Sequence, residues 1–116
     1  MAIIYHMTKP QTWKMAKEKN VYDFCALKTD GFIHCSTLEQ TLPTANRFFR
    51  DELQIIVLVI DEDKVNAKII YEPADDVDES FPHIYGEINL DAVIKVQELE
   101  KDADDYFIGL KDQVYL

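Results

Sequence analysis

The sequence predicts a single α+β domain, with two helices in the first half of the chain and several strands after them. Two helix starts, at Thr8 and at Thr37, have the spacing of a capping box. The apolar run at residues 54–60 is the strongest strand signal, and shorter strand-like segments follow it. Helices and strands in separate blocks are typical of α+β domains, whereas regular alternation would indicate a doubly wound parallel sheet.

The first helix is expected to begin at Thr8 and to end near Asn20. Thr8 and Gln11 have the capping-box spacing. Pro10 is tolerated in the first turn, because its missing N–H would have no partner there. Trp13 begins the apolar stripe that we expect this helix to bury.

The second helix is expected to begin after Thr37, with Gln40 completing the capping box. Its apolar residues recur at helical spacing, which predicts one core-facing stripe. The stripe contains Leu38, Leu42, Ala45, Phe49 and Leu53. Pro43 lies within this pattern, so we expect a kink or two short helices rather than one smooth helix.

Strands are expected where apolar and aromatic residues run together or alternate. They fall at residues 3–7, 21–24, 32–35, 54–60, 68–71, 83–88 and 92–99. Residues 54–60 are apolar on both faces, so this strand should be central and covered on both sides. Residues 74–80 should form an acidic loop. We expect one domain over residues 1–116, with a core at about 3–99 and an acidic tail at 100–116 that docks a short helix on the core.

The charge of the chain is strongly negative. It has 22 acidic and 12 basic residues, and the formal net charge is −10. Such a charge repels phosphate backbones and anionic lipid surfaces at long range, which argues against bulk nucleic-acid or membrane binding. It leaves open a single small anionic ligand held by local donors.

Cysteine usage and hydropathy bear on the compartment of the protein. Cys25 and Cys35 lie ten residues apart with no C-x-x-C motif, so neither a disulfide framework nor a zinc ribbon is expected. No apolar run approaches membrane-spanning length, and residues 1–8 are too short for a signal-peptide core. We therefore expect a cytoplasmic protein with free thiols. The oligomeric state and the role of the acidic tail stay open.

Each histidine of the chain lies inside a short strand-like segment. The three are His6, His34 and His83. Residues two apart in a strand project to the same face, so His34 shares a face with Phe32 and Ser36, and His83 shares one with Tyr85. If these faces meet on one sheet, they form a polar pocket of imidazoles, a hydroxyl and a phenol.

Glu87 shares the predicted face of His83 and Tyr85. A tyrosine ring can stack on a base, and a carboxylate can bind ribose hydroxyls or stabilise an oxocarbenium-like centre. We therefore name His34, His83 and Glu87 as candidate catalytic residues. The alternatives are that Glu87 is an ordinary solvated glutamate and that His34 is a buried histidine bonded to a backbone carbonyl.

The arginines and a metal site offer weaker alternatives. The only arginines, Arg47 and Arg50, lie on the second predicted helix, and Arg47 projects away from the apolar stripe towards solvent, where it can pair with Asp51.

Three histidines can also form an open catalytic metal site. No H-x-H or H-E-x-x-H spacing supports that site here, so we assign no metal. A serine–histidine dyad is disfavoured, because the chain lacks a G-x-S-x-G elbow.

At these residues the chain resembles a small, mostly bacterial family, the domain of unknown function catalogued under the number nine-five-two. The resemblance covers about residues 3–99. It is carried by Tyr5-His6, Gly31-Phe32-Ile33-His34-Cys35-Ser36, Ala45-Asn46-Arg47-Phe48 and Phe81-Pro82-His83-Ile84-Tyr85-Gly86. That family is grouped by fold with the ADP-ribosylation proteins, which implies a split mixed or antiparallel sheet, two helices in the N-terminal half and an NAD cleft.

The wider superfamily implies roles for single residues. RNA 2′-phosphotransferases carry a tyrosine-histidine strand, a glycine and a histidine-x-serine strand, and this chain is similar in kind and order. The resemblance implies a cofactor site for NAD. Its residues would be His6 at the nicotinamide ribose, Thr8 on the same strand, His34 and Ser36 on the adjoining wall, and Tyr85 or His83 opposite. The late-strand glutamate of active transferases has its nearest match in Glu87.

The leading hypothesis is a protein that binds a nucleotide such as NAD or ADP-ribose. If it is an enzyme, the expected reaction is cleavage of the nicotinamide–ribose bond or ADP-ribosyl transfer, and the acceptor stays open. One alternative is a non-catalytic module that binds a small molecule or a protein. A second is a histidine-ligated metalloenzyme. Fold-level likeness alone does not decide among them.

Overall fold

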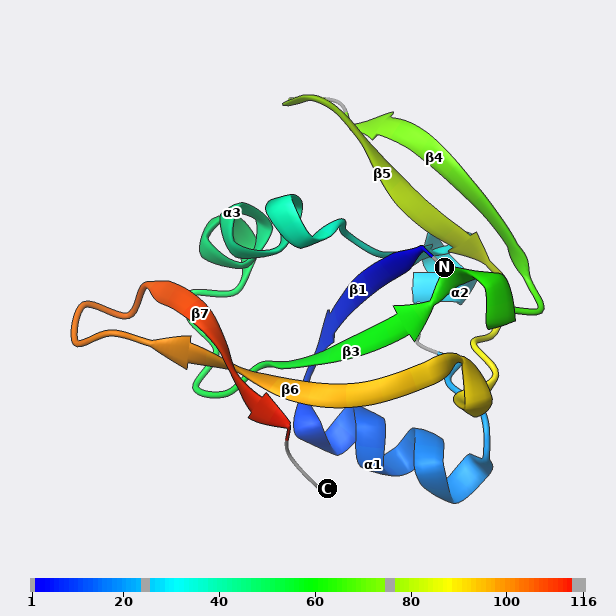
Figure 1. The fold of residues 1–116 in the computed structure, drawn as a ribbon, viewed down its shortest axis with the longest axis horizontal. Coiled ribbons are helices and arrows are strands. Elements are labelled where there is room, and N and C mark those ends of the chain that lie inside the picture. Colours follow the sequence, from blue (N-terminus) through cyan, green and yellow to red (C-terminus); the bar gives the residue numbers. More distant parts are fainter. Residues whose placement is uncertain (1, 24–25, 75–76, 114–116) are drawn as a thin grey trace.

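The structure is a computed structural model that describes residues 2–23, 26–74 and 77–113. Its elements follow the chain in an α+β order (Figure 1). They are β1 (Ile3–Thr8), α1 (Pro10–Lys19), α2 (Ala26–Thr29), β2 (Ile33–His34), α3 (Leu38–Phe48), β3 (Ile56–Asp61), β4 (Lys68–Ala74), β5 (Val77–Tyr85), β6 (Val93–Lys101) and β7 (Phe107–Gln113). Two 3₁₀ turns connect strands of different sheets, with Glu62–Lys64 between β3 and β4 and Leu90–Ala92 between β5 and β6.

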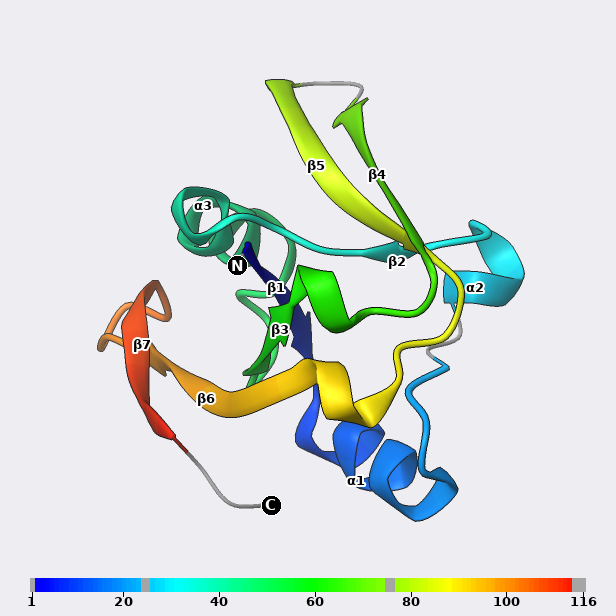
Figure 2. The ribbon, with the colours of Figure 1, turned by 45° about the vertical axis from the view of Figure 1, so that its right-hand side comes forward.

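The strands form two separate sheets. One has the order β1-β3-β6-β7, the other has the order β2-β5-β4, and every strand pair is antiparallel among the described residues. The β4–β5 hairpin stands apart from the four-stranded sheet in both views (Figures 1 and 2). The predicted α+β class and the antiparallel pairing of the strands are therefore confirmed.

The segment after β2 joins the two sheets. The Cys35 N–H donates to the Pro82 carbonyl on β5 at 3.0 Å, which extends the three-stranded sheet by one residue. The next residue turns to the other sheet, where Ser36 and Tyr5 exchange two backbone hydrogen bonds of 2.7 and 2.8 Å. The four residues 33–36 therefore hold the β2-β5-β4 sheet against β1.

The strand predicted to be central is central. β3 lies between β1 and β6, and all six of its residues are buried. Leu58 on one face packs in a cluster with Trp13 of α1, and Val57 on the other face packs with Ala45 of α3. The two longer helices therefore cover opposite faces of the four-stranded sheet (Figure 1). Each fully buried aliphatic side chain contributes about 1.5–3 kcal/mol, so β3 anchors both halves of the core.

The start of α1 was predicted wrongly. The helix begins at Pro10 with Lys9 as its N-cap, and Thr8 is instead the last residue of β1, paired with Ile56. Thr8 is buried and hydrogen-bonded to the Tyr22 hydroxyl at 2.9 Å, so its side chain is not available to cap a helix. Strand pairing has overridden the local capping signal.

The start of α3 was predicted correctly, and the helix is not divided at Pro43. The capping box forms, with the Thr37 N–H donating to the Gln40 side-chain oxygen at 3.0 Å. Pro43 lies inside one continuous helix, so the second of the two expected alternatives, two short helices, does not occur. Pro43 and Glu39 are both exposed, so water can solvate the Glu39 carbonyl that lacks a donor.

The expected apolar stripe of α3 is only partly buried. Ala45 is fully buried, and Leu42 and Phe49 pack at the edge of the core. Leu38 is 55% exposed and Leu53 is 98% exposed, so these two assignments are wrong. The helix ends at Phe48, so the helical spacing that would bring Leu53 to the core no longer applies.

Three other expectations are corrected. Of the acidic loop expected at 74–80, Ala74 belongs to β4 and residues 77–80 belong to β5, and residues 75–76 lie outside the described residues. The tail forms strand β7 on the edge of β6 rather than a short helix. Of the strand expected at 21–24, the described residues 21–23 form only a single bridge, between Tyr22 and Ile88, and Phe24 lies outside the described residues. Helix α2 was not predicted. Cys35 is a buried free thiol, and Cys25 lies outside the described residues.

Gly86, where β5 ends, is expected to resist substitution. Its φ is +157°, and a Cβ at this position would lie 2.8 Å from the Cβ of Ala67. Gly86→Ala should lower the free energy of unfolding by about 1–3 kcal/mol, the usual cost of overpacking. Urea denaturation measures this loss. Gly109→Ala is the control, because nothing lies within 4 Å of its added Cβ. Equal losses in the two variants would contradict the prediction.

Candidate functional site

Four ring side chains gather on the outer face of the three-stranded sheet. His34 of β2 pairs directly with His83 of β5, and their ring centroids are 5.1 Å apart. Phe32 stacks on His83 at 4.1 Å between centroids, with an interplanar angle of 18°. Tyr85 lies 5.2 Å from the same Phe32 ring. We call Phe32, His34, His83 and Tyr85 the ring face.

A carboxylate from the third strand lies at the edge of the ring face. The Glu72 Oε1 atom accepts a hydrogen bond of 2.8 Å from His83 Nδ1–H and a second, short one from the Tyr85 hydroxyl. The hydrogen bond from Tyr85 and, after it, the one from His83 lower the pKa of Glu72. The bond between Glu72 and Tyr85 also raises the pKa of Tyr85. Among the described residues Glu72 Oε2 accepts no hydrogen bond, so one carboxylate oxygen is open to a ligand.

His34 has a carboxylate partner of its own. Its Nε2–H donates to Asp30 Oδ2 at 3.0 Å, and its side chain is 58% exposed. The residues on either side in β2, Ile33 and Cys35, are buried, so the predicted alternation of this strand is confirmed. Burial raises the pKa of the Cys35 thiol, which keeps it protonated and unreactive.

His6 is separated from the other two imidazoles. It is 4% exposed, in the core below β2, and its ring contacts that strand only through the backbone, with Nδ1–H donating to the His34 carbonyl at 2.6 Å. His6 Nε2 lies 2.7 Å from the Tyr22 hydroxyl, which also bonds Thr8. Burial lowers the pKa of His6 to about 4, so the ring is neutral at pH 7.

The remaining predicted site residues lie away from the ring face. Thr8 and Ser36 are buried side chains, at 4% and 2% exposure. Glu87 follows the end of β5 and lines a separate cavity with Val21 and Asn66. The sequence placed Glu87 in one strand with His83 and Tyr85, but the strand stops at Tyr85, so this alternation ends before it reaches Glu87.

Two side chains of the candidate site were not predicted from the sequence, and both come from β4. Glu72 is the carboxylate that contacts His83 and Tyr85, and Lys68 pairs directly across from Tyr85, which places both side chains on one face. Lys68 makes no ion pair among the described residues. Knowledge of the β4–β5 register would have identified both residues. The sequence between the two strands has no turn motif that predicts this register.

Neither arginine of the chain contributes to the ring face. Arg47 is exposed on α3 above the Phe48 ring. Arg50 stacks on Tyr106 at 3.8 Å and donates to two backbone carbonyls of the β6–β7 turn. The part of the chain that the structure describes also holds no group of three or more histidine, cysteine, aspartate or glutamate residues placed to bind a metal ion.

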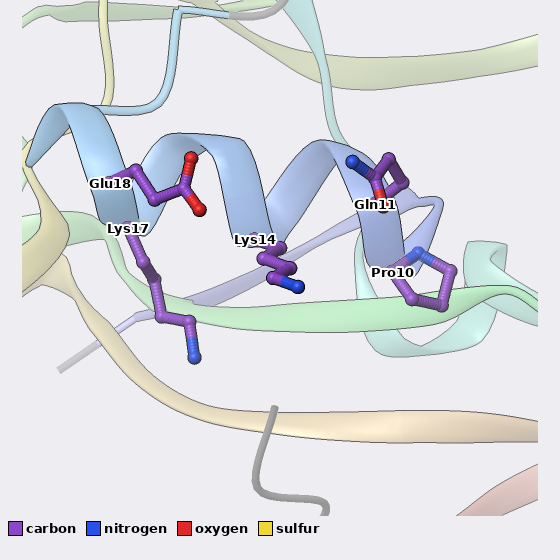
Figure 3. A pocket seen from close by; sticks show the side chains of 5 residues that line it. All are labelled: Pro10, Gln11, Lys14, Lys17 and Glu18. Atoms are coloured by element: carbon purple, nitrogen blue, oxygen red, sulfur yellow. The ribbon is translucent and has the colours of Figure 1, made fainter.

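A larger cavity lies on α1, away from the ring face (Figure 3). It has a volume of about 530 Å³ and is lined by Pro10, Gln11, Lys14, Lys17 and Glu18. All of these residues come from one helix, and its four polar side chains at the cavity are exposed. The cavity is therefore a groove along a solvated helix. In the described part of the chain no helix is long and apolar enough to span a membrane.

Comparisons with known proteins find one family and one solved relative. The family model described as "Protein of unknown function (DUF952)" matches residues 7–96. The crystal structure of protein CC0527 from Caulobacter crescentus is similar, with 26% identity, a TM-score of 0.82, and coverage of 92% of this chain and 94% of that one. Its solution NMR structure gives 27% identity and a TM-score of 0.78, with 91% of each chain covered. No curated protein matches.

Proposed function

The chain belongs to the DUF952 family, a family of proteins of unknown function, and we propose from the site itself that it binds a nucleotide of the NAD or ADP-ribose type on the ring face. The single observation that carries this proposal is the convergence of four rings and one carboxylate from three different strands on an exposed surface. Exposed aromatic clusters are uncommon unless they bind something.

Each part of such a ligand has a matching group on this surface. An aromatic base or a nicotinamide ring can stack on the exposed Tyr85 ring, beside Phe32. The open Oε2 of Glu72 can accept from ribose hydroxyls. Lys68, which shares the face of Tyr85, supplies the positive charge that a phosphate needs on an acidic protein.

The reaction that suits this surface is cleavage of the nicotinamide–ribose bond, with or without ADP-ribosyl transfer. Positive charge develops at the ribose as that bond breaks, and a fixed carboxylate stabilises it. Glu72 suits this role better than Glu87, because its hydrogen bonds to Tyr85 and His83 hold it ionised beside the rings. The split antiparallel sheet supports a likeness to the ADP-ribosylation fold.

Three residues predicted as cofactor contacts take a supporting place in this proposal. His6 holds the His34 carbonyl from below, and Thr8 holds Tyr22, the hydroxyl partner of His6. Ser36 fixes the end of the β2 segment against β1 through its backbone. We propose that they keep the ring face rigid and that the ligand contacts His34, His83, Tyr85 and Glu72.

Replacing Glu72 tests the proposal. In NMR titrations with ADP-ribose or NAD, the His34 and His83 imidazole signals should shift while the buried His6 signal stays in place. Glu72→Gln should weaken binding about tenfold or more, because a charge-assisted hydrogen bond contributes about 1.5–3 kcal/mol. Glu87→Gln is the matched control and should bind like the wild type. No shift at millimolar ligand would reject the proposal, and a larger loss in Glu87→Gln would move the site to the other cavity.

A further inference from the structure

The tautomer of His83 is fixed by its neighbour. Glu72 is held ionised, so its oxygen can only accept, and the proton of the neutral imidazole must therefore lie on Nδ1. His83 Nε2 then carries a lone pair, and among the described residues it has no hydrogen-bond partner. The side chain is 12% exposed and stacked on Phe32, so its orientation is fixed as well.

In a general base of this kind, a carboxylate orients the imidazole through one ring nitrogen, and the other ring nitrogen has a free lone pair that can accept a proton. We propose that His83 is the general base of this site, with Glu72 as its positioning residue through Oε1, and that the acceptor it activates is water or another hydroxyl. This inference rests on the proposed function, because it requires the nucleotide to lie on the ring face.

The proposed step balances with one base and no acid. The hydroxyl oxygen forms a bond to C1′ of the ribose as the bond from C1′ to the nicotinamide nitrogen breaks. Nicotinamide leaves with that electron pair as a neutral base, so nothing has to protonate it. The hydroxyl loses one proton, which His83 Nε2 accepts, and the resulting imidazolium is stabilised by the Glu72 carboxylate.

The acceptor class follows from this proton count. A carboxylate acceptor is already ionised at neutral pH and needs no base, whereas a hydroxyl must lose its proton as it attacks. Four charged or titratable groups lie on the same face of the sheet as His83. They are Glu72 and Lys68 on β4, Tyr85 on β5 and His34 on β2, the last paired with Asp30.

The test separates binding from chemistry. ADP-ribose affinity is measured by calorimetry, and nicotinamide release from NAD is followed by chromatography between pH 5 and 8, with and without added methanol. His83→Asn is the central variant, because its amide can still donate to Glu72 but has no bare ring nitrogen. We expect release at saturating NAD to be at least about 100-fold slower, a much larger change than the loss of affinity that follows from removing the ring contact of His83, together with loss of the fall in rate at acid pH.

Two further arms complete the design. Methanol should divert part of the wild-type product to the methyl glycoside, and His83→Gln should repeat the result if His83→Asn folds poorly. Release by both variants within threefold of wild type would overturn the inference, and so would ADP-ribose binding without any release by wild type. Both results leave nucleotide binding in place, whereas failure to bind either ADP-ribose or NAD would overturn the proposed function itself.

Discussion

The folded protein is expected to lose about 3 kcal/mol of stability through His6 alone when the pH falls from 7 to 4. The pKa of His6 is about 4 in the folded protein, and a histidine in an unfolded chain titrates near 6.5. Between these two values the unfolded chain binds a proton that the folded protein does not. Stability from this group is therefore complete above about pH 6.5 and is lost as the pH falls towards 4.

Burial is the main cause of this shift. His6 is 4% exposed, so a charge on its ring would have to leave water. The hydrogen bond to the His34 carbonyl opposes the shift, and the nearby His34 ring adds to it. Protonation would add a proton at Nε2, which faces the Tyr22 hydroxyl, and would leave the Nδ1–H bond to the His34 carbonyl in place.

Urea denaturation at pH 7, 6, 5 and 4 measures this effect, with His6→Asn as the reference. The asparagine amide can replace the Nδ1 donor to the His34 carbonyl but cannot take up a proton. The carboxylates of the chain titrate in both proteins, so the difference between the two stability curves isolates His6. An equal loss of stability in both proteins would show that His6 does not cause it.

The sequence located much of the ring face because period-two alternation is local. Alternation placed His34 beside Phe32 and His83 beside Tyr85, and the pairing of β2 with β5 then brought the two pairs together. Glu72 could not be found in this way, because it reaches His83 only through the register of the β4–β5 hairpin. Contacts that depend on register between strands are invisible to a single-sequence pattern.

His6 was grouped with the other histidines for a related reason. Alternation in β1 states which residues share a face, but both faces of this strand are largely covered, one by α1 and the other by α3. A histidine there is buried on either face. The prediction for the acidic tail was wrong for a different reason. Its short apolar segment has no helical stripe, and it forms a strand because it pairs with the free edge of β6.

The second large effect is expected at Asn46, where one side chain anchors the C-terminal hairpin to α3. Its amide donates to the Phe107 carbonyl at 2.9 Å, and its oxygen accepts from the Phe107 N–H at 2.7 Å.

Phe107 is buried in the cluster around Val57 and Leu99, so Asn46→Ala would leave two backbone groups without partners. We expect a loss of about 2–4 kcal/mol in the free energy of unfolding and faster amide exchange in β7. Gln97→Ala is the control, because Gln97 makes one exposed bond to Lys111 in the same hairpin. If Asn46→Ala loses no more unfolding free energy than Gln97→Ala, then pairing with β6 alone holds β7 in place.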